Sequence, residues 1–226
     1  MRSVVIANRD AKDSLFAAFA SVAKALGNGH RAEIVDVLAQ GERSVDELAG
    51  EIGQSVANTS QHLRVLAQAG LVQSRRAGTR VIYRPASEGV LDLWTAVRGV
   101  AAEHVASVEV LADAYLGDRT EVESVTMADL AARLAEGSVV LLDVRPRAEY
   151  RAGHLPEALS TPVDELPSLL DALPGGVEVV AYCRGPYCVY ADDAVRLLLA
   201  RGRAARRLDV GFPEWRRAGL PVAVPA

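Results

Sequence analysis

The chain has 226 residues, of which half are apolar and about a quarter are charged, a composition typical of a soluble globular protein. We expect two domains, because single hydrophobic cores usually stop growing before about 250 residues. No apolar run approaches the ~18 residues of a membrane-spanning helix, and residues 1–13 lack the apolar core of a signal peptide. These features exclude an integral membrane protein and predict a cytoplasmic location, where the two cysteines would be kept as thiols.

Charge is distributed unevenly along the chain. The overall formal charge of −4 conceals a net charge of +2 over residues 1–89 and of −6 over residues 90–226. The segment from Ile52 to Ser87 contains no acid and five arginines, which are Arg64, Arg75, Arg76, Arg80 and Arg84. A local basic segment of this kind predicts contact with a polyanion such as DNA, although the charge of the whole chain argues against it.

The first part of the chain predicts a series of short helices. Residues 12–26 form the first, whose core-facing stripe comprises Leu15, Phe19, Val22 and Leu26. Residues 31–38 form the second. Ser44 and Glu47 have the spacing of a capping box and begin the third, and Ser55 can cap a fourth.

A basic hairpin follows the fourth helix. The buried side of that helix is expected to comprise Val56, Thr59, Leu63 and Leu66, and Gly70 stands where a left-handed C-terminal cap is needed. Residues 71–85 predict two strands around a glycine-containing turn, with arginines on both strands. This order of elements predicts a mainly α winged helix-turn-helix.

The segment "SVANTSQHLRVLAQAGLVQSRRAGTRVIYRP" contains a serine-rich turn, the pattern S-x-H-L-x-x-L-x-x-A-G-L-V and an arginine-bearing wing. In these features, residues 12–116 resemble the ArsR/SmtB repressors. The resemblance implies that the fourth helix enters the major groove and that the wing contacts the flanking backbone. The implied DNA-binding residues are Ser55, Asn58, Thr59, Ser60, Gln61, His62 and Arg64 on the helix, and Arg75, Arg76 and Arg80 on the wing. The alternative is that these are solvated surface residues.

Residues 87–116 predict one long helix with a heptad seam. Its apolar positions are spaced 4-3-4-3 and comprise Val90, Trp94, Val97, Ala101, His104, Val108, Leu111 and Tyr115. A helix of this length cannot be buried by one small domain, and the family dimerises through it, so we expect a homodimer on an inverted-repeat DNA site. His104 could be a metal ligand or an interface residue. The histidine and cysteine patterns of metal-sensing relatives are missing, so we expect no metal and no cofactor.

The polar segment 117–124, "GDRTEVES", lacks periodicity and predicts a linker. The expected domains are therefore a winged-helix and dimerisation domain over 1–116 and a second domain over 125–226. In the second domain, continuous apolar strands alternate with helices, which predicts an α/β fold with a parallel sheet. Cys183 follows the strand "VEVVAY" and precedes a helix, the place where ligands bind in such sheets. Backbone amides and the helix dipole there would lower the pKa of its thiol.

Residues 124–226 resemble the rhodanese family in "LLDVRPRAEYRAGHLPEALSTP" and in "LDVGFPEWRRAGLPV", with Val210 in place of one glycine. The resemblance implies a sulfurtransferase fold in which Cys183 carries a persulfide. It also implies that Asp143, Arg145 and His154 have structural roles. Arg184 matches a basic residue of some active members. Pro186 and Cys188 depart from the family's usual loop, so thiosulfate cannot be assumed as the substrate.

Cys188 has two interpretations. It can be a small residue that caps the helix after the loop, or it can be a resolving thiol that attacks a persulfide on Cys183. We favour the second, because cysteine is uncommon and easily oxidised.

These patterns predict a DNA-binding transcriptional repressor whose rhodanese-like domain senses or handles reactive sulfur. Its expected small-molecule partner is a sulfur donor or acceptor. One alternative is a thiosulfate or persulfide sulfurtransferase enzyme whose winged helix only dimerises it. The other is a repressor with an inactive rhodanese module.

Overall fold

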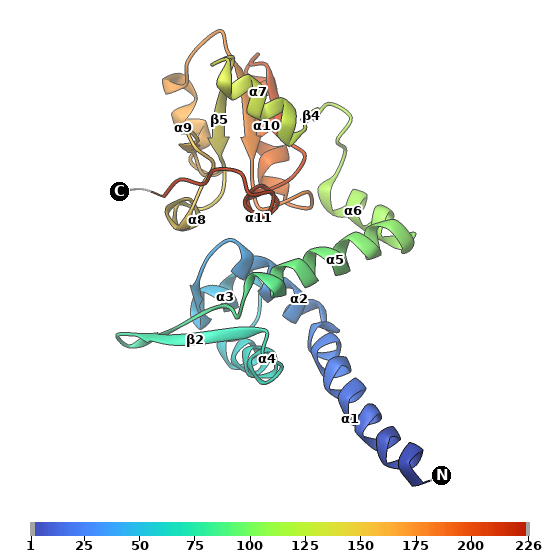
Figure 1. Ribbon diagram of the computed structural model, residues 1–226. Helices are drawn as coiled ribbons and strands as arrows, with labels where there is room; N and C mark the ends of the chain where they lie inside the picture. The colour runs from blue at the N-terminus through green and yellow to red at the C-terminus, as the bar shows by residue number, and fades with distance from the viewer. Residues whose placement is uncertain (1–2, 225–226) are drawn as a thin grey trace. The chain divides into compact units, whose positions relative to one another are not determined.

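The computed structural model describes residues 3–224, and the chain divides into two compact units at Val100 and Ala101 (Figure 1). This division falls before the segment 117–124 that the sequence indicated as a linker. In the described part of the chain, no helix is both long and apolar enough to cross a membrane.

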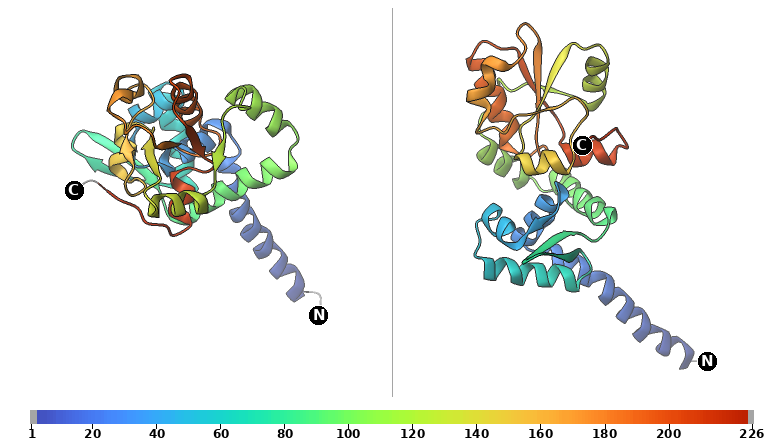
Figure 2. Two further views of the ribbon diagram at one scale, coloured as in Figure 1. Left: turned by 90° about the horizontal axis from the view of Figure 1, so that it is seen from above. Right: turned by 90° about the vertical axis from the view of Figure 1, so that its left-hand side faces the viewer.

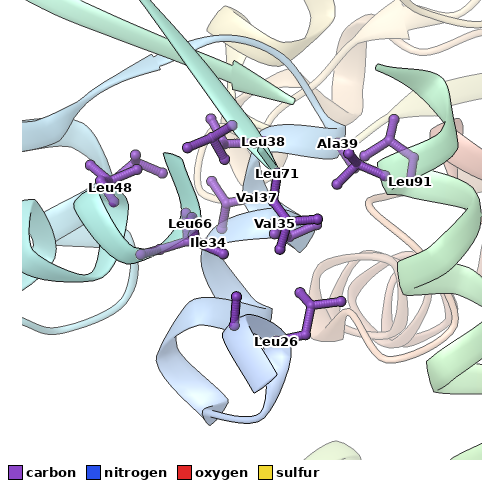
Figure 3. Packing of buried hydrophobic residues seen from close by; sticks show 14 of the residues in the cluster. Leu26, Ile34, Val35, Val37, Leu38, Ala39, Leu48, Leu66, Leu71 and Leu91 are labelled. Carbon is purple, nitrogen blue, oxygen red and sulfur yellow. The ribbon is translucent and has the colours of Figure 1, made fainter. Parts of the chain in front are cut away.

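The first unit is a winged helix. Its elements are α1 (Ser3–Leu26), α2 (Gly29–Ala39), β1 (Arg43–Ser44), α3 (Val45–Glu51), α4 (Val56–Gln68), β2 (Val72–Ala77), β3 (Arg80–Pro85) and most of α5 (Glu88–His104). The predicted caps are confirmed: Ser44 and Glu47 form the capping box of α3, and the Ser55 hydroxyl accepts from the Asn58 amide at the start of α4. The three strands are antiparallel in the order β1-β3-β2. Leucines and valines from α2, α3, α4 and α5 form its core (Figure 3).

The stripe on α1 only partly faces this core. Leu26 is buried, and Val22 packs against the core cluster. Leu15 and Phe19, which were predicted to face the core as well, are 52% and 62% exposed. The prediction was wrong for these two residues because α1 begins at Ser3 and is therefore much longer than the expected helix. Its first part extends beyond the helices that could cover it (Figure 2).

The predicted single helix over 87–116 is two helices. α5 ends at His104 and α6 (Ser107–Leu116) follows after Val105 and Ala106. In the seam, Val90 is buried in the winged-helix core, whereas Leu111 and Tyr115 are exposed. From Ala102 to Tyr115 no side chain is buried in this chain, so intramolecular packing does not hold the two segments in line.

The second unit is an α/β domain, as predicted. After α6 it comprises β4 (Ser124–Val125), α7 (Met127–Ala135), β5 (Val139–Asp143), α8 (Arg147–Ala152), β6 (Leu159–Ser160), α9 (Leu166–Leu169), the 3-10 turn η1 (Leu170–Ala172), β7 (Glu178–Tyr182), α10 (Val189–Ala200), β8 (Ala205–Leu208) and α11 (Phe212–Arg217). The five strands are parallel in the order β4-β8-β7-β5-β6.

Two hydrophobic clusters cover the faces of this sheet. α9 and α10 pack on one face, and α7 and α11 pack on the other (Figures 1 and 2). A buried ion pair lies at the carboxyl end of β5: Arg145 Nη2 donates to Asp143 Oδ2 at 2.6 Å and to the Gly153 carbonyl at 2.8 Å. The Tyr182 hydroxyl donates to the same Asp143 oxygen at 2.5 Å. β7 therefore ends at a fixed place, and the next residue is Cys183.

Candidate functional site

The helix α4 presents only part of its predicted DNA-binding set to solvent. Asn58, Gln61 and Arg64 are exposed, and Arg64 Nη1 donates to Gln61 Oε1 at 2.8 Å. Ser60 is half-buried, and Ser55 is exposed but its hydroxyl is occupied as the helix cap. At 100° per residue, Gln61 and Arg64 lie opposite the buried leucines of α4 and form its outer face.

Thr59 cannot contact DNA, which corrects the prediction from the sequence. It is fully buried, and its hydroxyl donates to the Ser55 carbonyl at 3.0 Å. The helical period that makes Thr59 a neighbour of Leu63 places it toward the core. It therefore supports the helix start rather than reading bases.

His62 lies on the side of α4 that faces α2. It is half-buried, and its ring centroid is 5.6 Å from that of His30. Burial, and then the charges of His30 and Arg31, lower the pKa of His62. The lowered pKa disfavours the charged imidazole that an ionic phosphate contact would use.

The hairpin register sorts the wing arginines by face. Arg80 is opposite Ala77, and Arg75 is opposite Ile82, which puts these two arginines on one face, while Arg76 lies on the other. A two-residue loop joins the strands, and Gly78 adopts φ +62° there, a conformation that favours glycine. Arg75 is held in an ion pair with Glu42 at 2.5 Å. Arg76 and Arg80 are exposed and make no ion pair with the described side chains, so both are available for phosphate.

The cysteine loop runs from Cys183 to Cys188, between β7 and α10. Cys183 is 2% exposed, and its thiol donates to the carbonyls of Gly185 at 3.7 Å and Cys188 at 3.6 Å. Cys188 is half-buried at the N-cap position of α10, and neither cysteine is in a disulfide. Cys188 thus occupies the cap position, although its side chain makes no cap hydrogen bond.

The two thiols have opposite pKa shifts. Burial raises the pKa of Cys183 well above its ordinary value, and the neighbouring Cys188 raises it further. A hydrogen bond from Cys183 lowers the pKa of Cys188, helped by the main chain of Arg184 and Tyr190. These two directions favour the thiolate of Cys188 over that of Cys183. The predicted lowering at Cys183 is wrong in this state, because burial outweighs the main-chain hydrogen bonds that favour its thiolate.

Arg184 is engaged by a buried carboxylate. Its Nη2 lies 2.5 Å from Oε1 of Glu149, which comes from α8 and is fully buried. Its guanidinium carbon also lies 5.5 Å from the Tyr190 ring centroid. The match to a basic residue of active rhodaneses makes Arg184 a candidate catalytic residue together with Cys183 and Cys188. Its contacts assign it to fixing the loop and placing positive charge near Cys188.

Gly211 forms the floor of the loop. A Cβ atom at this position would lie 2.3 Å from the Arg184 carbonyl carbon and 2.4 Å from the Gly185 nitrogen. The next residue, Phe212, donates its amide to the Cys183 carbonyl at 3.2 Å. Val210 replaces the first glycine of the family's closing motif, and Gly211 is the one that the loop requires.

Sequence reasoning missed several charged residues around the loop. Glu149 is buried beneath Arg184, and Asp192 is buried in the first turn of α10. Arg119 Nε donates to Asp192 Oδ2 at 2.5 Å, and Arg207 Nε lies 3.6 Å from Asp192 Oδ1. One sequence feature could have revealed Asp192. It is an acidic residue among the alanines and leucines on the apolar side of α10, where a solvated residue is not expected. Within residues 3–224, no group of three His, Cys, Asp or Glu side chains is arranged to hold a metal ion.

Comparison with known proteins separates the same two regions. Residues 28–74 match the bacterial regulatory protein arsR family, and residues 126–218 match the rhodanese-like domain. The HTH-type transcriptional regulator Rv0324 of Mycobacterium tuberculosis is 48% identical over 94% of this chain and 93% of its own length. The chain belongs to the ArsR-family transcriptional regulators with a rhodanese-like domain.

Other relatives of this ArsR-family regulator resemble one of its halves. A sulfurtransferase of Allochromatium vinosum is 33% identical over 46% of this chain and 97% of its own length. The solved homodimeric winged helix-turn-helix DNA-binding domain of Mb0332 from Mycobacterium bovis is 46% identical, covering 42% of this chain and 87% of that one with a TM-score of 0.40.

Proposed function

We propose that this ArsR-family regulator acts as a homodimer on an inverted-repeat DNA site in the cytoplasm, and that Cys183 and Cys188 set its DNA affinity by reacting with sulfane sulfur. The observation that carries the proposal is the pair of free thiols at the two ends of one loop, with Cys183 Sγ 3.6 Å from the carbonyl oxygen of Cys188. A thiolate beside a protonated thiol has both a nucleophile and a resolving group at hand.

The reaction balances without an added oxidant. The Cys188 thiolate attacks the outer sulfur of a persulfide donor, R–S–SH, forming Cys188–S–SH and releasing the donor as a thiolate, R–S⁻. Cys183 then gives up its proton and attacks Cys188 Sγ, so that a disulfide forms and hydrosulfide leaves. The sulfane sulfur is reduced to sulfide while the two thiols are oxidised to the disulfide. Entry at Cys188 reverses the order that the sequence analysis expected, because Cys183 is the more buried and more protonated thiol.

DNA binding is proposed from the outer face of α4 and the free arginines of the wing. We propose that Gln61 and Arg64 read bases and that Arg76 and Arg80 contact phosphates, because the first two form the outer face of α4 and the other two are exposed on the wing. A second copy of the chain is the proposed cover for the exposed apolar side chains of α1, Leu15, Phe16 and Phe19, and for those of α5.

A sulfurtransferase enzyme is the second candidate. It is favoured by the similarity to the Allochromatium vinosum sulfurtransferase and by the same loop. An enzyme would pass the sulfur from the loop to a small acceptor over many turnovers, whereas the regulator needs one event per chain. An inactive rhodanese module is the third candidate, and it predicts no reaction at either thiol.

The test is a titration of DNA from the chain's own promoter region by fluorescence anisotropy, before and after treatment with glutathione persulfide. We expect the apparent Kd to change about tenfold or more in the wild type, and to return when dithiothreitol reduces the disulfide. The matched control is the Cys183→Ser/Cys188→Ser variant, whose Kd should not respond.

Three outcomes separate the candidates. A donor-dependent Kd that requires the cysteines supports the regulator. An unchanged Kd with continuous sulfur transfer to an acceptor thiol supports the enzyme. An unchanged Kd with unmodified cysteines supports the inactive module and refutes sulfur chemistry in this loop.

A further inference from the structure

Arg119 reaches the cysteine loop from outside the rhodanese-like region. It lies three residues beyond the end of α6 and before the matched residues 126–218. Its Nη2 donates to the Pro186 carbonyl at 3.1 Å, and its Nε donates to Asp192 Oδ2 at 2.5 Å. Pro186 lies in the loop between the two cysteines. A guanidinium that binds two acceptors through separate nitrogens has a fixed orientation.

A second arginine fastens the same segment to α10. Arg196 Nη2 donates to the Leu116 carbonyl at 3.1 Å and to the Asp118 carbonyl at 2.8 Å. Leu116 is itself buried. The end of α6 and the residues after it are thus fixed to α10, the helix that follows the cysteine loop. Among the described hydrogen bonds of this segment, the one from Arg119 to Pro186 reaches the loop itself.

Asp192 keeps Arg119 in place. It is fully buried, so its carboxylate requires a cation, and Arg119 is the closer of its two arginines. Arg119 retains 25% side-chain exposure, which leaves room for its other nitrogens to follow a moving acceptor. The Pro186 carbonyl is such an acceptor, because a disulfide between Cys183 and Cys188 requires their Cα atoms to lie about 4.4–6.8 Å apart and restrains the four residues between them.

We propose that Arg119 is a positioning residue of the cysteine loop, and that it links the sulfur state of the loop to the conformation of residues 116–119 at the end of α6. The sulfur step of this inference rests on the proposed function. The link is reciprocal: if the loop with a disulfide binds Arg119 less well than the dithiol loop, then releasing Arg119 favours the disulfide by the same factor.

The test compares proteins with and without the Arg119 side chain, both of which lack the Asp192 carboxylate. Arg119→Gln alone would leave Asp192 buried without its closer partner, so the variant is made as Arg119→Gln/Asp192→Asn and compared with Asp192→Asn, which retains the arginine. Arg119→Lys tests rescue, since an ammonium can pair with Asp192 but cannot bridge both acceptors as a planar fork does. Arg147→Gln, which removes an exposed ion pair with Glu165, is the neutral control. Thermal unfolding establishes that each variant is folded.

Two readouts are measured on the full-length chain. The first is the pH dependence of Cys188 alkylation by iodoacetamide, which needs no sulfur donor. The second is the change in promoter-DNA affinity on treatment with glutathione persulfide. Relative to Asp192→Asn, the double variant should have a shifted alkylation midpoint, and its DNA response should be smaller by about fivefold or more, although the disulfide still forms. Arg119→Lys should lie between wild type and the double variant.

The result that overturns the inference is a double variant and an Asp192→Asn variant that both match the wild type in both readouts while the wild type responds to the donor. A wild type that does not respond refutes the proposed function instead, and the alkylation profile then still decides whether Arg119 positions the loop. A shifted profile supports the positioning role, and an unshifted one removes it.

Discussion

Replacing Gly211 by alanine tests whether the loop is held by close packing from beneath. The added Cβ would lie 2.3 Å from the Arg184 carbonyl carbon and 2.4 Å from the Gly185 nitrogen. Ordinary contact begins near 3.4 Å, so the loop or the start of α11 must move by about 1 Å. Both neighbouring atoms are main chain, and no side-chain rotation can relieve the contact.

The cost follows from this displacement. Forced overpacking typically costs 1–3 kcal/mol, and the hydrogen bond from the Phe212 amide to the Cys183 carbonyl would contribute about 1 kcal/mol more if lost. We therefore expect Gly211→Ala to lower the free energy of unfolding of the rhodanese-like domain by about 3 kcal/mol. Backbone strain adds nothing, because φ −116° and ψ −173° are open to any residue.

The assay is urea unfolding followed by the fluorescence of buried Trp215, with Trp94→Phe in every protein to remove the signal of the other unit. Gly175→Ala is the matched control, since a Cβ there would meet nothing within 4 Å and its φ is not in the left-handed region. That change should be neutral or stabilising by up to about 1 kcal/mol. If Gly211→Ala unfolds within about 0.5 kcal/mol of Gly175→Ala, the close packing beneath the loop does not exist in solution.

Three further predictions concern the buried network, the wing and the thiol pair. Tyr182→Phe leaves a buried Asp143 oxygen without its hydroxyl donor and should cost about 2–3 kcal/mol in the same urea assay, and a cost below 0.5 kcal/mol would contradict the network. Arg80→Ala should reduce the slope of log K against log salt for DNA binding by about 0.9 if it contacts one phosphate, and an unchanged slope removes it from the interface. The lowered pKa of Cys188 keeps its thiolate populated at pH values where an ordinary thiol is protonated. Because Cys183 is the largest cause of that lowering, Cys183→Ala should move the pH midpoint of Cys188 alkylation upward. A midpoint that stays or falls shows that Cys183 does not stabilise that thiolate.

The elements that local pattern determines were predictable from the sequence. The Ser44 and Glu47 capping box, the basic hairpin and the run of parallel strands all depend on neighbours within a few residues or on period, and all are present. The cysteine loop was placed correctly at the end of β7 for the same reason.

The wrong predictions concern residues whose role depends on how deeply they are buried in the folded chain. The period of α4 puts Thr59 inside, but its polarity made it a candidate DNA contact as well, and only the packed structure chooses between the two. A heptad pattern could not reveal that α5 and α6 separate at Val105 and Ala106, where no intramolecular packing supports a straight helix. The burial of Cys183, which raises its pKa where a lowering was predicted, depends on contacts with residues far away in the sequence.

The charged residues around the loop were out of reach for a related reason. Arg119 and Asp192 are separated by more than seventy residues, and neither belongs to a local motif. Their contact exists because the segment after α6 returns to the start of α10, which no periodic pattern encodes.

If the sulfur state of the loop determines whether the protein occupies DNA, the two forms of the loop must separate between bound and free protein. The regulator is treated with less than one equivalent of glutathione persulfide per chain, DNA-bound protein is separated from free protein, and the mass of the peptide that contains Cys183 and Cys188 is measured in each fraction. We expect the disulfide form, lighter by two hydrogens, to be concentrated in one fraction and the dithiol form in the other. If both fractions hold the two forms in the same ratio, the sulfur state of the loop does not control DNA binding.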